Sequence, residues 1–512
     1  MNTDSGKQII KNIIWNGISI LITALINIIL TPVITRNIGI EANGFVDLAN
    51  TCVTYIDIIT VALNAFAARY IAIEYHNGNY KEANKFYSSV AVADLILAVL
   101  LFVPCSAMVW KLQFILNISD NLVSDVKLLF FLVLLKWCIN VTGTVFSVSA
   151  FIKNKTSITY RNSGISALIN AFTLAGLIYF TKIHVYYMAA GSLAAAIVNL
   201  WMNLHCTKYL TPELQIHKKD FSFEKVKKLL SSGIWNSINN IGNMLNSGLD
   251  LLVCNKLLSG VVMGQVSISK MIGRLMTLFT NVMVSAFQPK QLEAYAKGET
   301  ERLVDYLKVA MKSVAIAGNV FFVCFVVLGK NFLELWIPGQ DNSRIFTLTV
   351  IVIIGDILVT VVRPLFYVYT LTDNLKAVCW ITICSGVLNV ISMFLLIANT
   401  KLGGYAVVGT TTVLNLIVHF WTAPYFAGRY LKIKMSIFLK IIFRHIAVCF
   451  VVTGLFYFIS VNLVVNSWMN FVKYGFLFGA GSFLITSALE LERKEIRTVM
   501  RIIYFKIKTI RR

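Results

Sequence analysis

Long apolar runs recur along the whole chain, each close to the ~20 residues that an α-helix needs to cross a bilayer. The first run is too long for a signal peptide, and no small-residue cleavage site follows it, so we expect it to remain in the protein. Several runs contain polar residues, which leaves twelve or thirteen spans open as alternatives. The best count is about fourteen transmembrane helices, at 13–35, 46–68, 88–110, 128–152, 163–180, 185–206, 229–254, 262–287, 309–328, 345–369, 377–397, 404–428, 441–459 and 468–489.

The basic residues between these runs alternate between dense and sparse loops. The longest dense loop, 207–228, carries Lys208, Lys218, Lys219, Lys225, Lys227 and Lys228, whereas the loops on the opposite side hold scattered single charges. Cytoplasmic loops are enriched in Lys and Arg, so both termini are predicted to lie in the cytoplasm. The last segment, 491–512, mixes basic and apolar residues and predicts an amphipathic helix on the anionic inner leaflet.

An internal repeat organises the spans into two halves. Ile14, Trp15 and Asn16 recur as Ile234, Trp235 and Asn236, and further matches keep the same shift of 220 residues. Six spans separate the copies, so both halves should have the same orientation and be related by an axis along the membrane normal. The predicted fold is an all-α integral membrane protein with six-helix lobes at 1–206 and 229–428. A cytoplasmic linker at 207–228, two additional helices at 429–490 and the basic tail at 491–512 complete it.

Composition supports the membrane class and narrows the chemistry. Hydrophobic residues make up 57% of the chain and charged residues only 14%, against roughly 25% in soluble domains. The net charge of +22 could indicate nucleic-acid binding, but basic loops beside membrane spans explain it more simply. The nine cysteines form no CxxC pair and the six histidines have no ligand spacing, so no disulfide framework, metal site or bound cofactor is expected.

Basic side chains inside the apolar runs are candidate substrate-binding residues, because each costs roughly 2.5 to 3.5 kcal/mol at the centre of a bilayer. Lys270 and Arg274 lie four residues apart in the eighth span and therefore share a helix face. Such a pair favours an anion, and a guanidinium offers phosphate two parallel donors. Arg363 in the tenth span is a third candidate, and Pro364 after it predicts a kink. Alternatively, acids on neighbouring spans neutralise the pair.

Three acidic residues also lie inside the apolar runs. Asp57 and Asp250 fall in the second and seventh spans, and Asp356 lies about two turns before Arg363. Protonation of a desolvated carboxylate could couple transport to H⁺, and a carboxylate could equally take part in coupling to Na⁺. The alternative, which we favour for Asp57 and Asp250, is a counter-ion role beside the basic residues.

Asparagines are concentrated in the two repeat-equivalent spans that open each lobe. Asn16, Asn236 and Asn240 are candidate substrate-binding residues, because carboxamides can hydrogen-bond sugar hydroxyls from the wall of a polar cavity. The same side chains also commonly bond neighbouring helices within a membrane. Both roles remain open from the sequence.

Several segments resemble a known family. The opening "IIWNGISILITALINIILTPVITRNIG", the "GFVDLANT" start of the second span, the "ARYIAIEYHNGNYKEAN" loop and the recurring "GIWNS" resemble the polysaccharide-transporter branch of the multidrug, oligosaccharidyl-lipid and polysaccharide exporter superfamily. The resemblance implies a two-lobe fold with alternating access. It also implies a bacterial plasma-membrane flippase that moves an undecaprenyl-diphosphate-linked oligosaccharide outward for capsule, O-antigen or related polysaccharide assembly.

Partners and competing functions follow from this expectation. The expected partners are the lipid-linked oligosaccharide diphosphate and the bilayer, with a polysaccharide polymerase and glycosyltransferases as neighbours and no nucleic acid. A lipid II flippase fits a basic cavity equally well, whereas a multidrug exporter of cationic drugs would favour an acidic one. A membrane glycosyltransferase or polymerase would normally need a large catalytic loop or nucleotide-sugar domain, and the sequence shows no acid-base constellation or phosphate-binding glycine loop. We therefore expect a transporter and not an enzyme.

Overall fold

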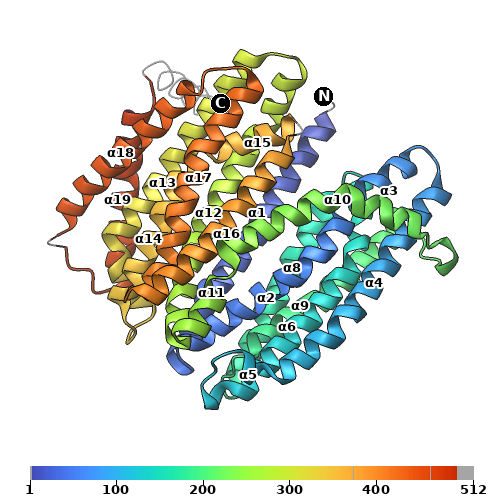
Figure 1. Ribbon diagram of the computed structural model, residues 1–512, viewed down its shortest axis with the longest axis horizontal. Helices are drawn as coiled ribbons and strands as arrows, with labels where there is room; N and C mark the ends of the chain where they lie inside the picture. Colours follow the sequence, from blue (N-terminus) through green and yellow to red (C-terminus); the bar gives the residue numbers. More distant parts are fainter. Residues whose placement is uncertain (1–2, 373, 462, 493–512) are drawn as a thin grey trace, which may run out of the picture. The chain divides into compact units, whose positions relative to one another are not determined.

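The computed structural model describes residues 3–372, 374–461 and 463–492, and every regular element in these ranges is helical (Figure 1). The all-α prediction is confirmed. Three 3₁₀ turns, η1 (Asp120–Leu122), η2 (Thr144–Ser147) and η3 (Lys218–Asp220), interrupt or join the helices of the first part. Its α-helices are α1 (Thr3–Asn37), α2 (Ile40–Asn64), α3 (Ala67–His76), α4 (Tyr80–Trp110), α5 (Leu112–Ile115), α6 (Val123–Gly143), α7 (Val148–Ile152), α8 (Thr156–Phe180) and α9 (Tyr187–Leu210).

The second part continues with helices of similar length. Two π-helical turns, η4 (Met244–Gly248) and η5 (Cys254–Leu258), flank the short α11. The α-helices are α10 (Phe223–Asn243), α11 (Asp250–Val253), α12 (Gly260–Ala296), α13 (Thr300–Trp336), α14 (Asn342–Thr360), α15 (Arg363–Leu371), α16 (Leu375–Asn399), α17 (Gly404–Leu431), α18 (Ser436–Ser460) and α19 (Trp468–Glu490). The predicted amphipathic tail falls almost wholly on residues 493–512, outside the described chain.

Within the described ranges, eleven helices are long and apolar enough to cross a membrane. They are the α1 segment Gly17–Asn37, the combined α2 and α3, and α4, α8, α9, α13, α14, α16, α17, α18 and α19. The other three predicted spans fall on α6, on α10 with α11, and on α12, which are helical but are not among these eleven. The protein is a multi-pass membrane protein, and the count of fourteen stays a prediction.

The predicted repeat reappears in the positions where helices begin. Thr3, Ile40 and Tyr80 start α1, α2 and α4, and the residues 220 positions later start α10, α12 and α13. The turns before α4 and α13 also correspond, because Gly78 (φ +76°) and Gly298 (φ +72°) both adopt a left-handed conformation that favours glycine. The repeat therefore extends from residue identity to backbone conformation.

The chain divides into two compact units. Unit 1 comprises the described residues up to Ser267 together with Cys379–Gly404, and unit 2 comprises Ile268–Val378 and the described residues from Tyr405 onward. Unit 1 thus includes α10, α11 and most of α16 as well as the helices of the predicted first lobe, and the predicted lobe boundaries stay a prediction. The connector between α9 and α10 is 211–222, shorter than the predicted linker 207–228 because both helices extend into it.

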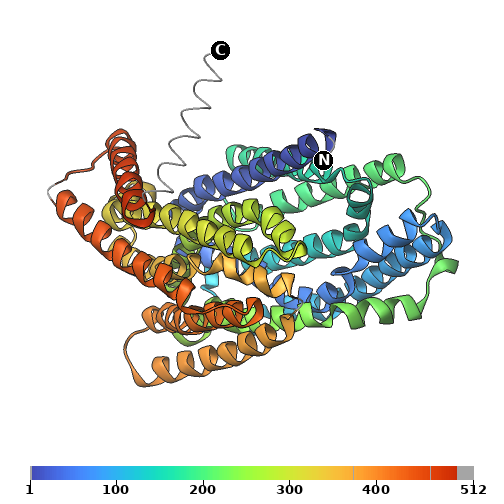
Figure 2. The same cartoon turned by 90° about the horizontal axis from the view of Figure 1, so that it is seen from above.

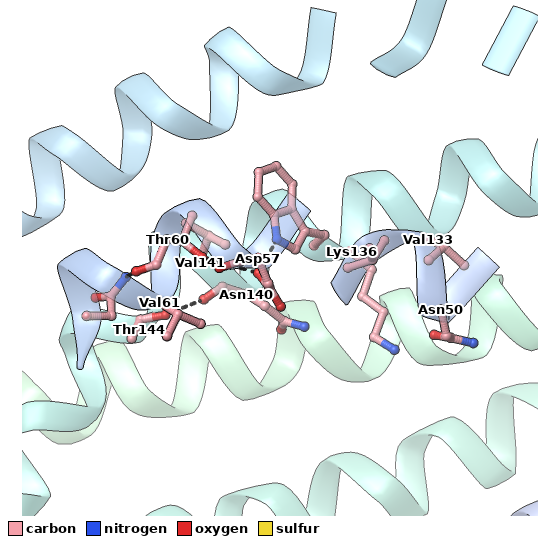
Figure 3. Close-up of a pocket in the computed structure, with 12 residues that line it drawn as sticks. Asn50, Asp57, Thr60, Val61, Val133, Lys136, Asn140, Val141 and Thr144 are labelled. Carbon is pink, nitrogen blue, oxygen red and sulfur yellow. Dashed lines mark hydrogen bonds between the residues drawn. The ribbon is translucent and has the colours of Figure 1, made fainter. Parts of the chain in front are cut away.

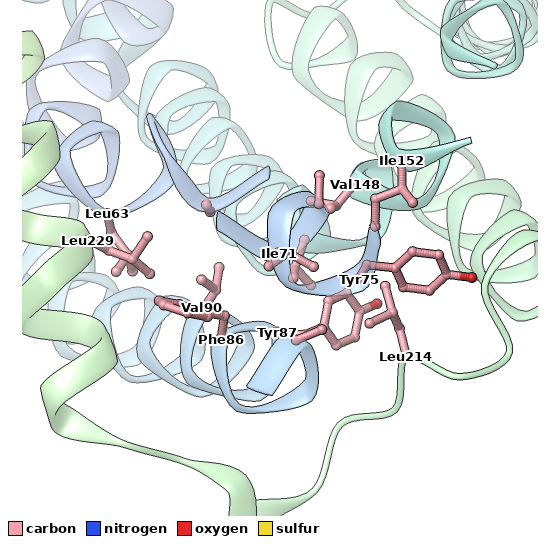
Figure 4. Packing of buried hydrophobic residues seen from close by; sticks show 14 of the residues in the cluster. Leu63, Ile71, Tyr75, Phe86, Tyr87, Val90, Val148, Ile152, Leu214 and Leu229 are labelled. Atoms are coloured by element: carbon pink, nitrogen blue, oxygen red, sulfur yellow. The ribbon is translucent and has the colours of Figure 1, made fainter. Parts of the chain in front are cut away.

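Unit 1 is a bundle in which α2 contacts α6 and α10, and α8 contacts α1 and α9. Figure 2 gives a second view of its long helices. At one end of the bundle, Ile71 and Phe86 pack with Leu229 in a buried apolar cluster (Figure 4). The connector joins this cluster through Leu214, and its backbone N–H at Ser222 donates to Ser89 Oγ at 2.9 Å. The connector is thus a packed part of unit 1.

Unit 2 is organised around α13, which contacts α14, α15, α18 and α19. Asn319 on α13 donates to Thr486 Oγ1 on α19 at 2.7 Å, inside the bundle. His445 on α18 and Glu490 on α19 are both fully buried, with 3.0 Å between Nδ1 and Oε1. The two helices outside the repeat are therefore tied to unit 2 by buried polar contacts as well as by apolar packing.

Candidate functional site

In unit 2, one face of α12 carries a row of polar residues, together with one glycine. Lys270, Arg274, Thr277 and Asn281 recur every three or four residues, which places them along one side of the helix. A Cβ at Gly273 would lie 2.9 Å from Asp356 Oδ2 and 2.8 Å from Val352 Cγ1, so the missing side chain lets α14 approach α12 closely. The row therefore faces the helix that carries Asp356.

Arg363 reaches the same face of α12. Its guanidinium donates to Asn281 Oδ1 at 3.2 Å and to Thr277 Oγ1 at 3.3 Å. The predicted kink is present, because α14 ends at Thr360 and α15 begins at Arg363 with Pro364 in its first turn. Pro is favoured at such a helix start, where its missing N–H costs nothing. The break places Arg363 at the beginning of a new helix.

Unit 2 thus brings Lys270, Asp356 and Arg363 together as predicted site residues. Asp356 lies within electrostatic range of both basic groups. Arg274 is exposed on the same helix as Lys270, one turn further on. We call Lys270, Arg274 and Arg363 the basic cluster. Basic side chains of this kind suit an anionic ligand, because charge-assisted hydrogen bonds to phosphate are strong.

A second polar site lies in unit 1, where α2 and α6 border a cavity of about 320 Å³ (Figure 3). We call it the α2–α6 pocket. Asn50, Val133 and Lys136 lie at one end in the view of Figure 3 and Thr60, Val61 and Thr144 at the other, with Asp57 and Asn140 between them.

Neutral donors hold Asp57 within this pocket. Its Oδ1 accepts a hydrogen bond from the indole N–H of Trp137 on α6 and a second, at 3.3 Å, from Thr60 Oγ1. Next to it, Asn64 donates to Asp94 Oδ1 on α4 at 2.9 Å. Within the described residues neither Asp57 nor Lys136 has an ion-pair partner at 4.0 Å or less. The predicted counter-ion role of Asp57 beside Lys270 and Arg274 joins residues of different units and stays a prediction.

The remaining predicted site residues lie in unit 1. Asn236 and Asn240 are half-buried on α10, and the side chain of Asn16 is outside the described part of the structure. Asp250 is buried in α11 between the two π-helical turns. One further asparagine of α10–η4, Asn246, donates to Thr382 O of α16 at 2.8 Å, so this carboxamide joins two helices.

Sequence reasoning missed most of the α2–α6 pocket. Lys136 is a weak candidate by sequence because it lies within reach of the outer interface, and nothing in the hydropathy singles out Asn50 or Asn140. The available signal is spacing: Lys136 and Asn140 on α6 and Thr144 at the start of η2 follow one another at intervals of four residues. A polar row of this kind within an apolar span could have identified the pocket.

Comparisons with known proteins place this geometry in context. Residues 9–292 match the protein family described as "Polysaccharide biosynthesis protein". The uncharacterized membrane protein EpsK of Bacillus subtilis (strain 168) is 25% identical over 464 residues, which cover 90% of this chain and 91% of that protein. Among solved structures, the lipid II flippase MurJ in an inward closed conformation aligns with a TM-score of 0.66 and 13% identity, over 93% of this chain and 98% of that one. An inward-facing multidrug resistance MATE family transporter aligns with a TM-score of 0.65 and 16% identity, over 81% of this chain and 95% of that one. These structures share the fold.

Proposed function

The chain belongs to the polysaccharide biosynthesis protein family, and on that premise we propose that it is a membrane flippase for a lipid-linked oligosaccharide. Its cargo is a polyprenyl-diphosphate-linked oligosaccharide, carried by alternating access from the inner to the outer leaflet of the bacterial plasma membrane. The exported sugar serves capsule, O-antigen or related polysaccharide assembly. Both termini of the flippase lie in the cytoplasm.

The observation that carries this proposal is the basic cluster in unit 2. A diphosphate cannot enter hydrocarbon without its hydration shell being replaced, because an isolated buried charge is very costly. Lys270, Arg274 and Arg363 can replace that shell with charge-assisted hydrogen bonds, and the lipid tail can remain in the bilayer throughout. Thr277 and Asn281 fix the direction of the Arg363 guanidinium, so little order has to be gained on binding.

The acidic residues supply two further roles. Asp356 limits the positive charge of the basic cluster, which keeps an anion from being held too tightly to leave. Asp57 or Asp250 is available for coupling to H⁺ or Na⁺. The expected neighbours in the pathway are a polymerase and glycosyltransferases, and the protein itself performs no covalent step.

Transport can be tested with purified protein in liposomes loaded with undecaprenyl-diphosphate-linked oligosaccharide. A membrane-impermeant glycosidase added outside then measures how fast the sugar reaches the outer leaflet. We expect Arg274→Ala to slow transport roughly 10- to 100-fold, since a hydrogen bond to a charged group contributes about 1.5–3 kcal/mol. Arg274→Lys should retain part of the activity, because it keeps the charge but loses the paired donors.

Arg302→Ala is the matched control. Arg302 is also an exposed arginine, but it pairs with Glu299 at 2.9 Å near the start of α13, away from the polar row of α12. It should transport at the wild-type rate. If wild-type protein does not move the lipid, the proposed function is wrong; if Arg274→Ala transports normally, Arg274 is not part of the site.

A further inference from the structure

The α2–α6 pocket of unit 1 and the basic cluster of unit 2 occupy equivalent positions in the internal repeat. Both lie between the second and fourth long helices of their repeat, α2 with α6 and α12 with α14 and α15. The break after α6 also recurs. Gly143 is the last residue of α6, and the residue 220 positions later, Arg363, is the first residue of α15. The shift of 220 residues pairs Asn50 with Lys270, Asp57 with Thr277, Lys136 with Asp356 and Gly143 with Arg363.

The two equivalent sites differ in charge. The basic cluster of unit 2 has three basic side chains, two of which lie within electrostatic range of Asp356, whereas the pocket has one carboxylate, Asp57, and one ammonium, Lys136. At the position of Arg363 the first repeat has glycine, and at the position of Lys270 it has a neutral carboxamide. One copy of the duplicated site is therefore richer in basic side chains, and the lining of the other pairs one carboxylate with one ammonium.

The pocket also offers hydrogen-bonding groups of both kinds. Within the described chain, Asp57 Oδ2, the side-chain carboxamide of Asn140 and the ammonium of Lys136 make no hydrogen bond to protein. Trp137 and Thr60 meanwhile hold Asp57 in place through its other oxygen. Acceptors and donors therefore line the same space, together with valine side chains.

This mixture disfavours two ligand classes, divalent cations and phosphates, on chemical grounds. A divalent cation prefers several anionic oxygens, but only one carboxylate lines the pocket, and no group of three metal-ligating side chains occurs among the described residues. A phosphate prefers several cations, and the pocket has one lysine. Sugar hydroxyls both donate and accept hydrogen bonds, as do the groups here. The volume of about 320 Å³ lies within the roughly 300–1,000 Å³ of small-molecule sites.

We propose that the α2–α6 pocket binds a sugar unit of the cargo. The proposal rests on the proposed function and assigns a neutral saccharide subsite to unit 1, at the repeat position where unit 2 carries its basic cluster. Asp57 and Asn140 accept hydrogen bonds from sugar hydroxyls, and Lys136 and the Asn140 amide donate to them. The apolar side chains contact the C–H faces of the ring.

The test compares two probes on purified full-length protein in nanodiscs. One is bare undecaprenyl diphosphate, and the other is the same lipid carrying a tetrasaccharide. We expect wild-type protein to bind the sugar-bearing lipid at least tenfold more tightly. Asn140→Leu and Lys136→Met should each reduce that preference about tenfold while leaving the affinity for the bare lipid unchanged, and the unchanged affinity also verifies folding. Asn121→Leu, an exposed asparagine in η1, is the control and should keep the full preference.

The outcomes separate the subsite from the function. Equal binding of both lipids by wild-type protein, or an unchanged preference in both pocket variants, overturns the subsite. A third outcome is that the preference depends on Na⁺ concentration. If the pocket variants then lose this Na⁺ effect but keep the preference for the sugar-bearing lipid, the pocket is a cation site, and the proposed subsite is overturned. If wild-type protein prefers the sugar-bearing lipid through the pocket but never transports it, the subsite stands and the flippase function fails.

Discussion

Helices α10 and α2 of unit 1 approach each other so closely that adding a single methyl group between them should strongly lower the stability of the protein. At Gly233 on α10, an alanine Cβ would lie 1.9 Å from Ala62 O, 2.7 Å from its carbonyl carbon and 2.9 Å from its Cα, all on α2. These are backbone atoms, so no change of rotamer can relieve the contact. The two helices must separate by about 1.5 Å to restore an ordinary contact distance.

The separation also affects the next turn of α10. Ser237 Oγ donates to Ile58 O of α2 at 2.6 Å, and the spacing of Gly233 and Ser237 is the small-xxx-small pattern of close helix pairs in membranes. Overpacking costs about 1–3 kcal/mol, and an interhelical hydrogen bond in a membrane contributes about 0.6 kcal/mol on average. Gly233→Ala should therefore lose about 1.5–3.5 kcal/mol, before the gain of about 1 kcal/mol that alanine brings to a helix.

A second glycine-to-alanine variant serves as a reference, because it has the same gain in helix propensity without the clash. Gly176 in α8 has open space around its Cβ position, so Gly176→Ala gains helix propensity without a clash. Melting of the two purified variants in the same detergent, followed by loss of the monodisperse peak on heating, should differ by several degrees. One kcal/mol shifts the Tm by roughly 2–4 °C in domains of 150–250 residues. Equal melting temperatures for the two variants would refute the inferred approach of α10 and α2.

Three further outcomes are expected from individual contacts. Replacing buried His445 by alanine should cost about 3–5 kcal/mol because it leaves Glu490 without its partner, and the double variant with leucine at both positions should melt above the single variant. Asn117→Ala should speed proteolysis of the loop before α6, since Asn117 Nδ2 donates to Asn255 O at 2.8 Å and Asn255 Nδ2 donates back to Asn117 O at 2.9 Å. A backbone hydrogen bond lowers the pKa of Glu213 in the connector. The ionised carboxylate therefore stabilises the folded connector at pH values above the pKa of an unfolded glutamate. This stabilisation is lost as the pH falls through the lowered pKa of Glu213. Hydrogen exchange should therefore show the connector loosening below that pH and not at pH 7.

The sequence predicted the elements of this protein well because membrane helices are specified locally. Each span needs about 20 apolar residues and satisfies its own backbone hydrogen bonds, so hydropathy alone locates it. The repeat was equally readable, since the matches from Ile14 to Asn16 and from Ile234 to Asn236 fix the shift at which the helices begin. Pro364 likewise predicted the break between α14 and α15.

Side-chain roles were readable only where two residues share one helix. Lys270 and Arg274 were identified as a pair from their spacing, and the structure adds Arg363 to the same face of α12 through Thr277 and Asn281. The sequence left open whether carboxamides line a cavity or join helices. Contact with α16 decides this for Asn246.

The α2–α6 pocket shows what only tertiary structure decided. Hydropathy indicates that α2 and α6 lie in the membrane but not which faces meet, because lipid and protein neighbours are equally apolar to a helix surface. Asp57 and Lys136 are 79 positions apart, and only the packing of their helices brings them to one cavity. The same applies to the grouping of α10 and α16 with unit 1, which depends on contacts such as that of Gly233. The chain thus encodes its helices within each segment, whereas the faces that meet depend on side-chain fit between distant segments.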